Sequence, residues 1–210
     1  MSYYLKGICA YFRENPGIFV FMILVTFAGV ICGSLLLRFL DEEPITEITK
    51  TLNHFFDNLK EYDSDILAAP ELFRDSFYKN GAILLLVWVL GLFPAGYLIV
   101  LPVLFLKGIS LGFTIGVLIH RYSIRGALFC LAAILPHNLF LVPAYIMGSA
   151  FAFAYSFYLF QNCFAKGKIK HTFFTQYCLY MILVMVLATL GALVEAFITP
   201  VFMRLVLPVL

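Results

Sequence analysis

Long apolar runs, separated by short polar segments, dominate this chain of 210 residues. Residues 17–40 form the first run, which is interrupted only by Arg38 near its end. A helix needs about 20 apolar residues to cross a bilayer, so this run predicts a first membrane span. Residues 81–105 predict a second span, which ends at Lys107 and is kinked by its prolines. Residues 172–199 predict the last span.

The pattern between the second and the last span admits two arrangements. Residues 108–119 would cover only about 18 Å as a helix, and residues 126–160 are too long for one span and contain two prolines. In one arrangement, 108–120 cross and 126–160 return once, with a kink or a re-entrant portion. In the other, 108–119 are re-entrant and 126–160 cross twice, which keeps Arg121 and Arg125 in the cytoplasm. The charges favour the second arrangement, and both give about five transmembrane helices.

Charge is distributed unevenly along the chain. Residues 41–80 contain ten acidic and four basic residues, whereas the N-terminal segment and the loop at Lys166–His171 are basic. Lys and Arg near the ends of spans favour the cytoplasmic side. We therefore expect a cytoplasmic N-terminus, an extracytoplasmic segment 41–80 and an extracytoplasmic tail at 200–210. Residues 1–16 carry apolar side chains at helical spacing, which predicts an amphipathic helix in the membrane interface.

Segment 41–80 carries an apolar stripe and predicts a helical hairpin. Its apolar residues recur at intervals of three and four, which is a helical spacing, and a second short helix is expected at about Pro70–Tyr78. The apolar face either packs against the spans or the outer leaflet, or it docks extracytoplasmic partners. The candidate partner-binding residues are Ile45, Ile48, Leu52, Phe55, Phe56, Leu59, Phe73 and Phe77.

Few polar groups lie inside the predicted spans, and each is a candidate site because ionisable groups are expensive in lipid. These intramembrane polar residues are His137, Asn138, Glu195 and Arg38. Glu195 is near the outer end of its span, where it reaches water, pairs with Arg38 or Arg204, or takes part in transport. His137 and Asn138 follow a proline. They either satisfy backbone carbonyls or bond to other helices, or they form a substrate or ion site.

Small residues and cysteines add two structural expectations. Gly108, Gly112 and Gly116 form a GxxxGxxxG pattern, which predicts close helix packing and self-association as a homodimer. The five cysteines lie in or beside apolar runs, and none forms a CxxC pair. Free cysteine behaves as a small buried hydrophobe. We therefore expect neither a disulfide framework nor a metal site.

The composition excludes several classes of protein. Hydrophobic residues make up 63% of the chain and charged residues 12%, against about 25% charged residues in soluble domains. An all-α, polytopic integral membrane protein is expected, and a nucleic-acid binder or an ordinary cytosolic enzyme is not. The chain contains no GxxxxGK[ST] loop, no HExxH and no G-x-S-x-G motif. A non-enzymatic protein without a cofactor is therefore predicted.

Three runs resemble one known family. They are FLKGISLGFTIG at 105–116, LPHNLFLVPAY at 135–145 and EAFITP at 195–200, supported by FREN at 12–15 and FRDSF at 73–77. Together they resemble stage II sporulation protein M of endospore-forming bacteria. The likeness extends over most of the chain, and the run at 135–145 is the most specific.

The resemblance implies a role in engulfment, in which the mother-cell membrane migrates around the forespore. Members of this family anchor the stage II sporulation proteins D and P, which degrade peptidoglycan. This implies a scaffold in the mother-cell membrane at the sporulation septum. Many wider relatives carry Gly after the His and an acidic residue four positions after it, where this chain has Asn138 and Leu141. The departure weakens the alternative hypothesis, a channel or transporter for ions or small solutes.

Overall fold

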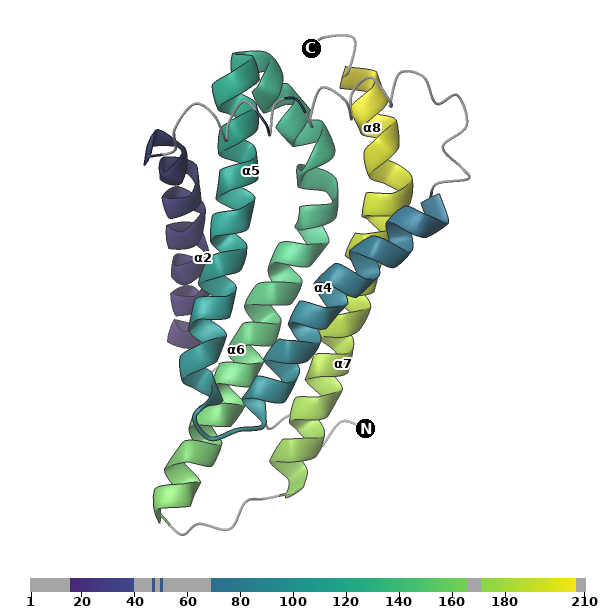
Figure 1. The fold of residues 1–210 in the computed structure, drawn as a ribbon. Helices are drawn as coiled ribbons and strands as arrows, with labels where there is room; N and C mark the ends of the chain where they lie inside the picture. Colours follow the sequence, from purple (N-terminus) through teal and green to yellow (C-terminus); the bar gives the residue numbers. More distant parts are fainter. Residues whose placement is uncertain (1–15, 40–46, 48–49, 51–68, 166–170, 207–210) are drawn as a thin grey trace.

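The computed structural model describes residues 16–39, 47, 50, 69–165 and 171–206. Every regular element in these ranges is helical (Figure 1). The elements are α2 (Pro16–Leu36), the 3-10 helix η1 (Leu37–Phe39), α4 (Ala69–Gly91), α5 (Gly96–Ala133), α6 (Leu135–Ala165), α7 (His171–Leu193), the π-helix η2 (Val194–Ile198) and α8 (Thr199–Val206).

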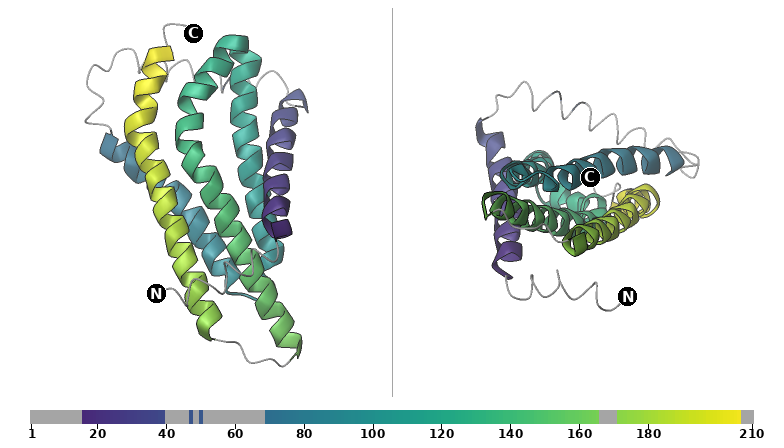
Figure 2. Two further views of the ribbon diagram at one scale, coloured as in Figure 1. Left: turned by 180° about the vertical axis from the view of Figure 1, so that it is seen from behind. Right: turned by 90° about the horizontal axis from the view of Figure 1, so that it is seen from below.

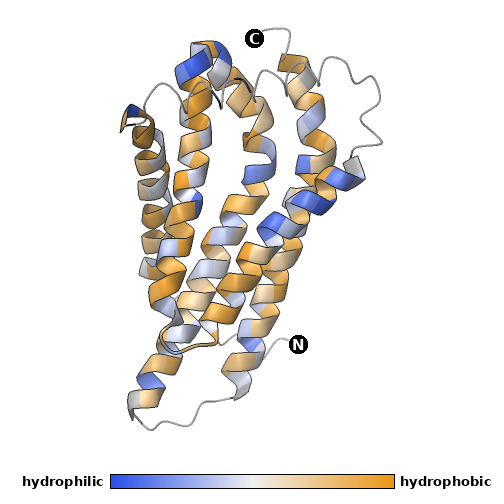
Figure 3. Cartoon of the chain, viewed as in Figure 1, coloured by the Kyte–Doolittle hydropathy of each residue, from blue (hydrophilic) through white to orange (hydrophobic). Residues whose placement is uncertain are grey.

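Four helical stretches in the described ranges are long and apolar enough to cross a membrane. They are Pro16–Phe39, Gly96–Ala133, Leu135–Cys163 and Thr172–Met203. Most of their length is apolar in Figure 3, whereas polar residues concentrate at the start of α4 and at the bend within α5. The predicted all-α, polytopic membrane fold is confirmed. The amphipathic helix predicted for residues 1–16 and most of the predicted stripe lie outside the described residues.

The helices run lengthwise beside one another and reverse direction along the chain (Figures 1 and 2). α5 bends back at Ser123, which has φ 53° and ψ −129°. We call this end of the bundle the Ser123 end, and the opposite end, with the turn at 92–95, the Pro94 end. The start of α2, the end of α6 and the start of α7 lie toward the Pro94 end, and α8 ends at the Ser123 end.

This path decides between the two arrangements predicted for the middle of the chain. Residues 96–122 form one helix toward the Ser123 end, and residues 126–160 return once, with a single turn residue, Ile134, between α5 and α6. The favoured arrangement, with 108–119 re-entrant and 126–160 crossing twice, is therefore wrong. It failed because the helix is continuous through Gly108, and because Arg121 and Arg125 lie at the Ser123 end, opposite the flanks of 166–170.

The predicted second span, 81–105, is also wrong. α4 ends at Gly91, the chain turns at 92–95, and α5 begins at Gly96. The turn has the sequence Leu-Phe-Pro-Ala and contains no charged residue, so hydropathy does not reveal it. Its backbone groups are satisfied locally, because Phe93 N–H donates to the Leu90 carbonyl (3.1 Å) and Gly96 N–H donates to the Phe93 carbonyl (3.0 Å). Such a turn satisfies the requirement that backbone groups in an apolar setting find internal partners.

Ser156 of α6 connects this turn to the bundle through hydrogen bonds. Its buried Oγ accepts a hydrogen bond from Tyr97 N–H (2.8 Å) and donates to the Phe93 carbonyl (2.6 Å). We expect Ser156→Ala to lower the free energy of unfolding by about 1.5 kcal/mol, because it leaves the Tyr97 N–H without its acceptor, whereas the Phe93 carbonyl keeps the bond from Gly96 N–H. Denaturant unfolding in mixed micelles measures the change. Ser34→Ala is the matched control, since Ser34 is exposed and bonds only to the Ile31 carbonyl of its own helix. Equal effects of the two substitutions would contradict the role of Ser156.

Aromatic side chains fill the bundle between this turn and its middle. The rings of Tyr155 and Tyr177 stack with centroids 4.5 Å apart, and those of Phe151 and Tyr180 stack at 4.7 Å. The fully buried Tyr177 donates its hydroxyl proton to the Trp88 carbonyl (2.7 Å). The Pro94 end is therefore a closely packed apolar core.

The GxxxGxxxG pattern lies against α2. A Cβ added at Gly108 would lie 3.0 Å from the Cα of Gly29, and one added at Gly112 would collide with the Val30 carbonyl. Gly33 of α2 is equally close to the Ile109 backbone. The face predicted to join two copies is therefore occupied by α2 of the same chain.

The last helix continues past the predicted end of its span. Residues 200–210 were expected to leave the membrane as a tail, but α8 extends from Thr199 to Val206. The wide π-turn at Val194–Ile198 precedes Pro200. Pro200 is the second residue of α8 and has no N–H to donate, and the bond that closes the π-turn comes from the residue before it, from Thr199 N–H to the Val194 carbonyl. The helix therefore continues beyond Thr199, where the predicted last span ends.

Candidate functional site

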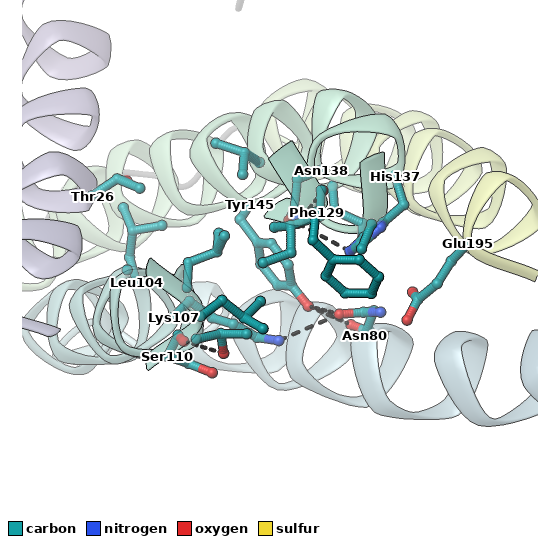
Figure 4. Close-up of a pocket in the computed structure, with 18 of the residues that line it drawn as sticks. Thr26, Asn80, Leu104, Lys107, Ser110, Phe129, His137, Asn138, Tyr145 and Glu195 are labelled. Carbon is teal, nitrogen blue, oxygen red and sulfur yellow. Dashed lines mark hydrogen bonds between the residues drawn. The ribbon is translucent and has the colours of Figure 1, made fainter. Parts of the chain in front are cut away.

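Polar side chains from four helical segments meet inside the bundle, around a cavity of about 340 Å³ (Figure 4). Asn80 comes from α4, Lys107 from α5, His137 and Tyr145 from α6, and Glu195 from η2. The rest of the lining is largely apolar and includes Leu104, Leu111 and Phe129. The site therefore places one cation and one carboxylate in a mainly apolar setting.

A chain of hydrogen bonds connects the cation to the carboxylate. Lys107 Nζ donates to Asn80 Oδ1 (3.3 Å), Asn80 Nδ2 donates to Ser76 Oγ (3.2 Å), and Ser76 Oγ donates to Glu195 Oε2. The Tyr145 hydroxyl also donates to Asn80 Oδ1 (2.8 Å). In the three bonds that run from Lys107 to Glu195, each donor lies on the lysine side and each acceptor on the glutamate side. The dipoles of Asn80 and Ser76 are therefore aligned with the two charges. The charges are linked through α4 without touching each other.

Lys107 is held over the ring of Tyr145 as well. Its Nζ lies 4.7 Å from the ring centroid, a distance at which the negative face of the ring attracts a cation. The lysine is half-buried, in the interior of α5 between Gly96 and the bend at Ser123. The predicted second span ends at Lys107, whereas the structure places this lysine within a continuous helix.

The carboxylate comes from the irregular turn of the last helix. Glu195 is the second residue of the π-helix Val194–Ile198. Single π-turns within α-helices are rare and occur frequently at functional sites. The side chain of Thr199 donates to the Val194 carbonyl (3.3 Å) at the end of this turn. A side-chain bond thus supports the π-turn that carries Glu195.

His137 and Asn138 lie beside the cavity, at the start of α6. Asn138 Nδ2 donates to the Ile134 carbonyl (2.8 Å) and lies 3.0 Å from His137 Nε2. Asn138 therefore satisfies a backbone carbonyl next to Pro136. The buried Nδ1 of His137 has no hydrogen-bond partner in the described part of the chain.

The comparisons with known proteins give one match. The family model for stage II sporulation protein M matches residues 18–200. The chain belongs to the stage II sporulation protein M family. No curated protein and no solved structure matches the chain. Family membership and the apolar helices together make it a sporulation-related membrane protein.

This member of the stage II sporulation protein M family brings together three of the four predicted intramembrane polar residues. His137, Asn138 and Glu195 all line the cavity. Arg38 is exposed in η1 and does not line the cavity. The side-chain partner of Glu195 is Ser76 rather than Arg38, and the Arg204 side chain lies outside the described part of the structure.

Four residues of the site were missed from the sequence: Ser76, Asn80, Lys107 and Tyr145. The sequence pattern predicts one span over 81–105, which places Ser76 and Asn80 in the outer segment and Lys107 at a membrane surface. The spacing of Ser76 and Asn80 is the signal that was available. Residues four apart share one face of a helix, so a single helix through both would have paired them.

The predicted partner-binding residues are only partly described. Phe73 and Phe77 stack with centroids 5.8 Å apart on α4, and the other six lie outside the described ranges. The short helix predicted at Pro70–Tyr78 is the first part of α4, which continues without a break to Gly91. It is therefore not a separate arm of a hairpin in segment 41–80.

Proposed function

We propose that this family member is a non-enzymatic membrane scaffold of the sporulation engulfment complex. In this proposal it recruits and anchors the peptidoglycan-degrading stage II sporulation proteins D and P. It does so in the mother-cell membrane at the septum, while that membrane migrates around the forespore. Family membership supports the setting, and the start of α4 supports the recruiting surface.

The start of α4 exposes apolar and charged side chains on a helix. It projects outward beside η2 (Figures 1 and 3), and Ser76 on its inner face is buried. Leu72, Phe77 and Tyr78 are exposed there, beside the exposed charges of Arg74 and Asp75. Protein interfaces combine aromatic anchors with a charged rim. This surface, which we call the α4 arm (residues 70–79), is the observation that carries the proposal.

The alternative hypothesis, a channel or transporter, requires a polar route through the bundle. Lys107 and Glu195, the charged side chains that lie inside the described part of the bundle, both line one cavity. Between this cavity and the Pro94 end, the interior is filled by fully or almost fully buried apolar and aromatic side chains, including Leu84, Val87, Val100, Tyr177 and Met181. The packing therefore favours the scaffold over a permeation path.

Co-purification of proteins D and P tests the α4 arm. We expect the double variant Leu72→Asp and Tyr78→Asp to capture at least tenfold less of both partners, since two central interface contacts cost about 2 kcal/mol or more. The variant Leu52→Asp and Phe55→Asp tests the predicted stripe in the same assay.

Phe93→Asp is the matched control, because Phe93 is equally exposed but lies at the Pro94 end. It should capture both partners normally. Undiminished capture by the α4 arm variant, with normal membrane insertion, would refute the role of this surface.

A further inference from the structure

The two charged groups of the cavity retain hydrogen-bonding capacity. Lys107 carries three N–H donors and gives one of them to Asn80. Glu195 receives one bond at Oε2, from Ser76, and a carboxylate has about four acceptor positions. His137 Nδ1 adds a buried group without a hydrogen-bond partner. Within the described residues, nothing else in the protein bonds to Lys107 Nζ or to the Glu195 carboxylate.

A purely structural charge pair would be arranged differently. Two buried charges offset their desolvation only when they touch in good geometry and their remaining positions are hydrogen-bonded. Here Lys107 and Glu195 attract each other across the cavity but form no direct ion pair. The space between them therefore suits a group with the opposite arrangement of charge: an anion against the lysine and a cation against the glutamate.

We propose that this cavity binds the head of a zwitterion that carries both a primary ammonium and an acidic group. The ammonium donates to Glu195 and the acidic group accepts from Lys107. The volume of about 340 Å³ lies at the lower end of the range for small-ligand pockets, which suits a small polar head. The inference does not depend on the scaffold proposal, because it rests on the interior of the bundle.

A neighbouring groove points to a lipid as the source of this head. A second cavity of about 510 Å³, with an almost wholly apolar lining, shares Leu111, Ile134 and Asn138 with the first. Its other walls include Leu131, Leu135 and Leu139, which are 57%, 50% and 66% exposed toward the surroundings of the bundle. A head in the polar cavity can therefore continue into an acyl chain in the apolar groove. Phosphatidylethanolamine has this combination of ammonium, phosphate and acyl chains.

Native mass spectrometry of the purified, delipidated full chain tests the proposal. The probes are phosphatidylethanolamine, phosphatidylcholine and phosphatidylglycerol with identical acyl chains. We expect phosphatidylethanolamine to bind about tenfold more tightly than phosphatidylcholine, whose methylated ammonium cannot donate a charge-assisted hydrogen bond to Glu195. Glu195→Gln should remove this preference without altering the weak binding of phosphatidylglycerol.

A second variant and a control keep the test independent of folding. Ser110→Phe places a ring at the exposed edge of the cavity without touching the Lys107–Glu195 chain of bonds, and it should also abolish the preference. Glu71→Gln removes an exposed carboxylate of α4 and should leave binding unchanged. Emission of Trp88, the only tryptophan, reports whether each variant is folded.

A free amino acid distinguishes the source of the zwitterion. If glycine binds alone and displaces the lipid, the site is a zwitterion site that also takes a soluble ligand, which supports the proposal with a different source. Two results would overturn it. One is equal binding of the three lipids by the wild-type protein, and the other is an unchanged preference in both Glu195→Gln and Ser110→Phe.

Discussion

Asn80→Leu is expected to lower the free energy of unfolding by about 3 kcal/mol, because it leaves a buried charge without its partner. Asn80 Oδ1 accepts from both Lys107 and Tyr145, and its amide donates to Ser76. Leucine has a similar volume, so the loss comes from the missing hydrogen bonds rather than from a void. Denaturant unfolding in mixed micelles, followed by the emission of Trp88 in the same helix, measures it.

Two comparisons test whether the loss of stability comes from the missing Asn80 hydrogen bonds. Asn162→Leu is the matched control, since Asn162 donates only to the Tyr158 carbonyl of its own helix, and a small change is expected. Adding Lys107→Met to Asn80→Leu should recover part of the stability, because the unpartnered cation is removed. If Asn80→Leu were no more destabilising than Asn162→Leu, the hydrogen-bond chain would not hold α4 in the bundle.

Gly112→Ala is expected to destabilise the protein by about 3 kcal/mol, at the upper end for overpacking, because backbone meets backbone. The added Cβ would collide with the Val30 carbonyl of α2, which cannot rotate away as a side chain can. Either α2 must move or the interface must open. The same denaturant titration measures the loss of stability.

The control for this substitution is Gly81→Ala within α4. A Cβ at Gly81 would lie 3.9 Å from Met185 Cε, an ordinary contact, so the higher helix propensity of alanine should keep it neutral or make it stabilising. Cross-linking in detergent addresses the homodimer predicted from the sequence. If Gly112→Ala abolished self-association while the stability of the single chain stayed unchanged, the glycines would join two copies rather than α2 and α5.

The outermost elements of the fold were predictable because their boundaries coincide with polar residues. The run at 17–40 lies between Pro16 and an acidic cluster, and the structure places α2 and η1 at 16–39. The middle of the chain was not predictable in this way. The reversal at 92–95 lies in apolar sequence, and a hydropathy pattern counts apolar residues without showing where the chain turns. The reversal at Ser123 lies among polar residues, but the charge pattern assigned Arg121 and Arg125 to the cytoplasmic side instead of to a bend between two helices.

The same limit of the hydropathy pattern decided which residues of the site were predictable. His137, Asn138 and Glu195 were found because polar groups are conspicuous within apolar runs. Asn80 and Lys107 were missed because their significance depends on which helix packs beside which. The predicted span 81–105 places Asn80 and Lys107 on opposite sides of the membrane. In the structure, α4 packs between α5, α6 and the last helix, and this packing brings the two side chains together.

Membrane insertion of α4 depends on α5. The uncharged part of α4, residues 81–91, is about 16 Å long as a helix, well short of the roughly 20 residues that the insertion machinery accepts as a span. The apolar turn at 92–95 has no charge that would hold it at the membrane surface. The two helices must therefore enter the bilayer together, because α5 is long enough to insert and α4 is not. The hydrogen bond from Lys107 to Asn80 can then form only after both helices have inserted.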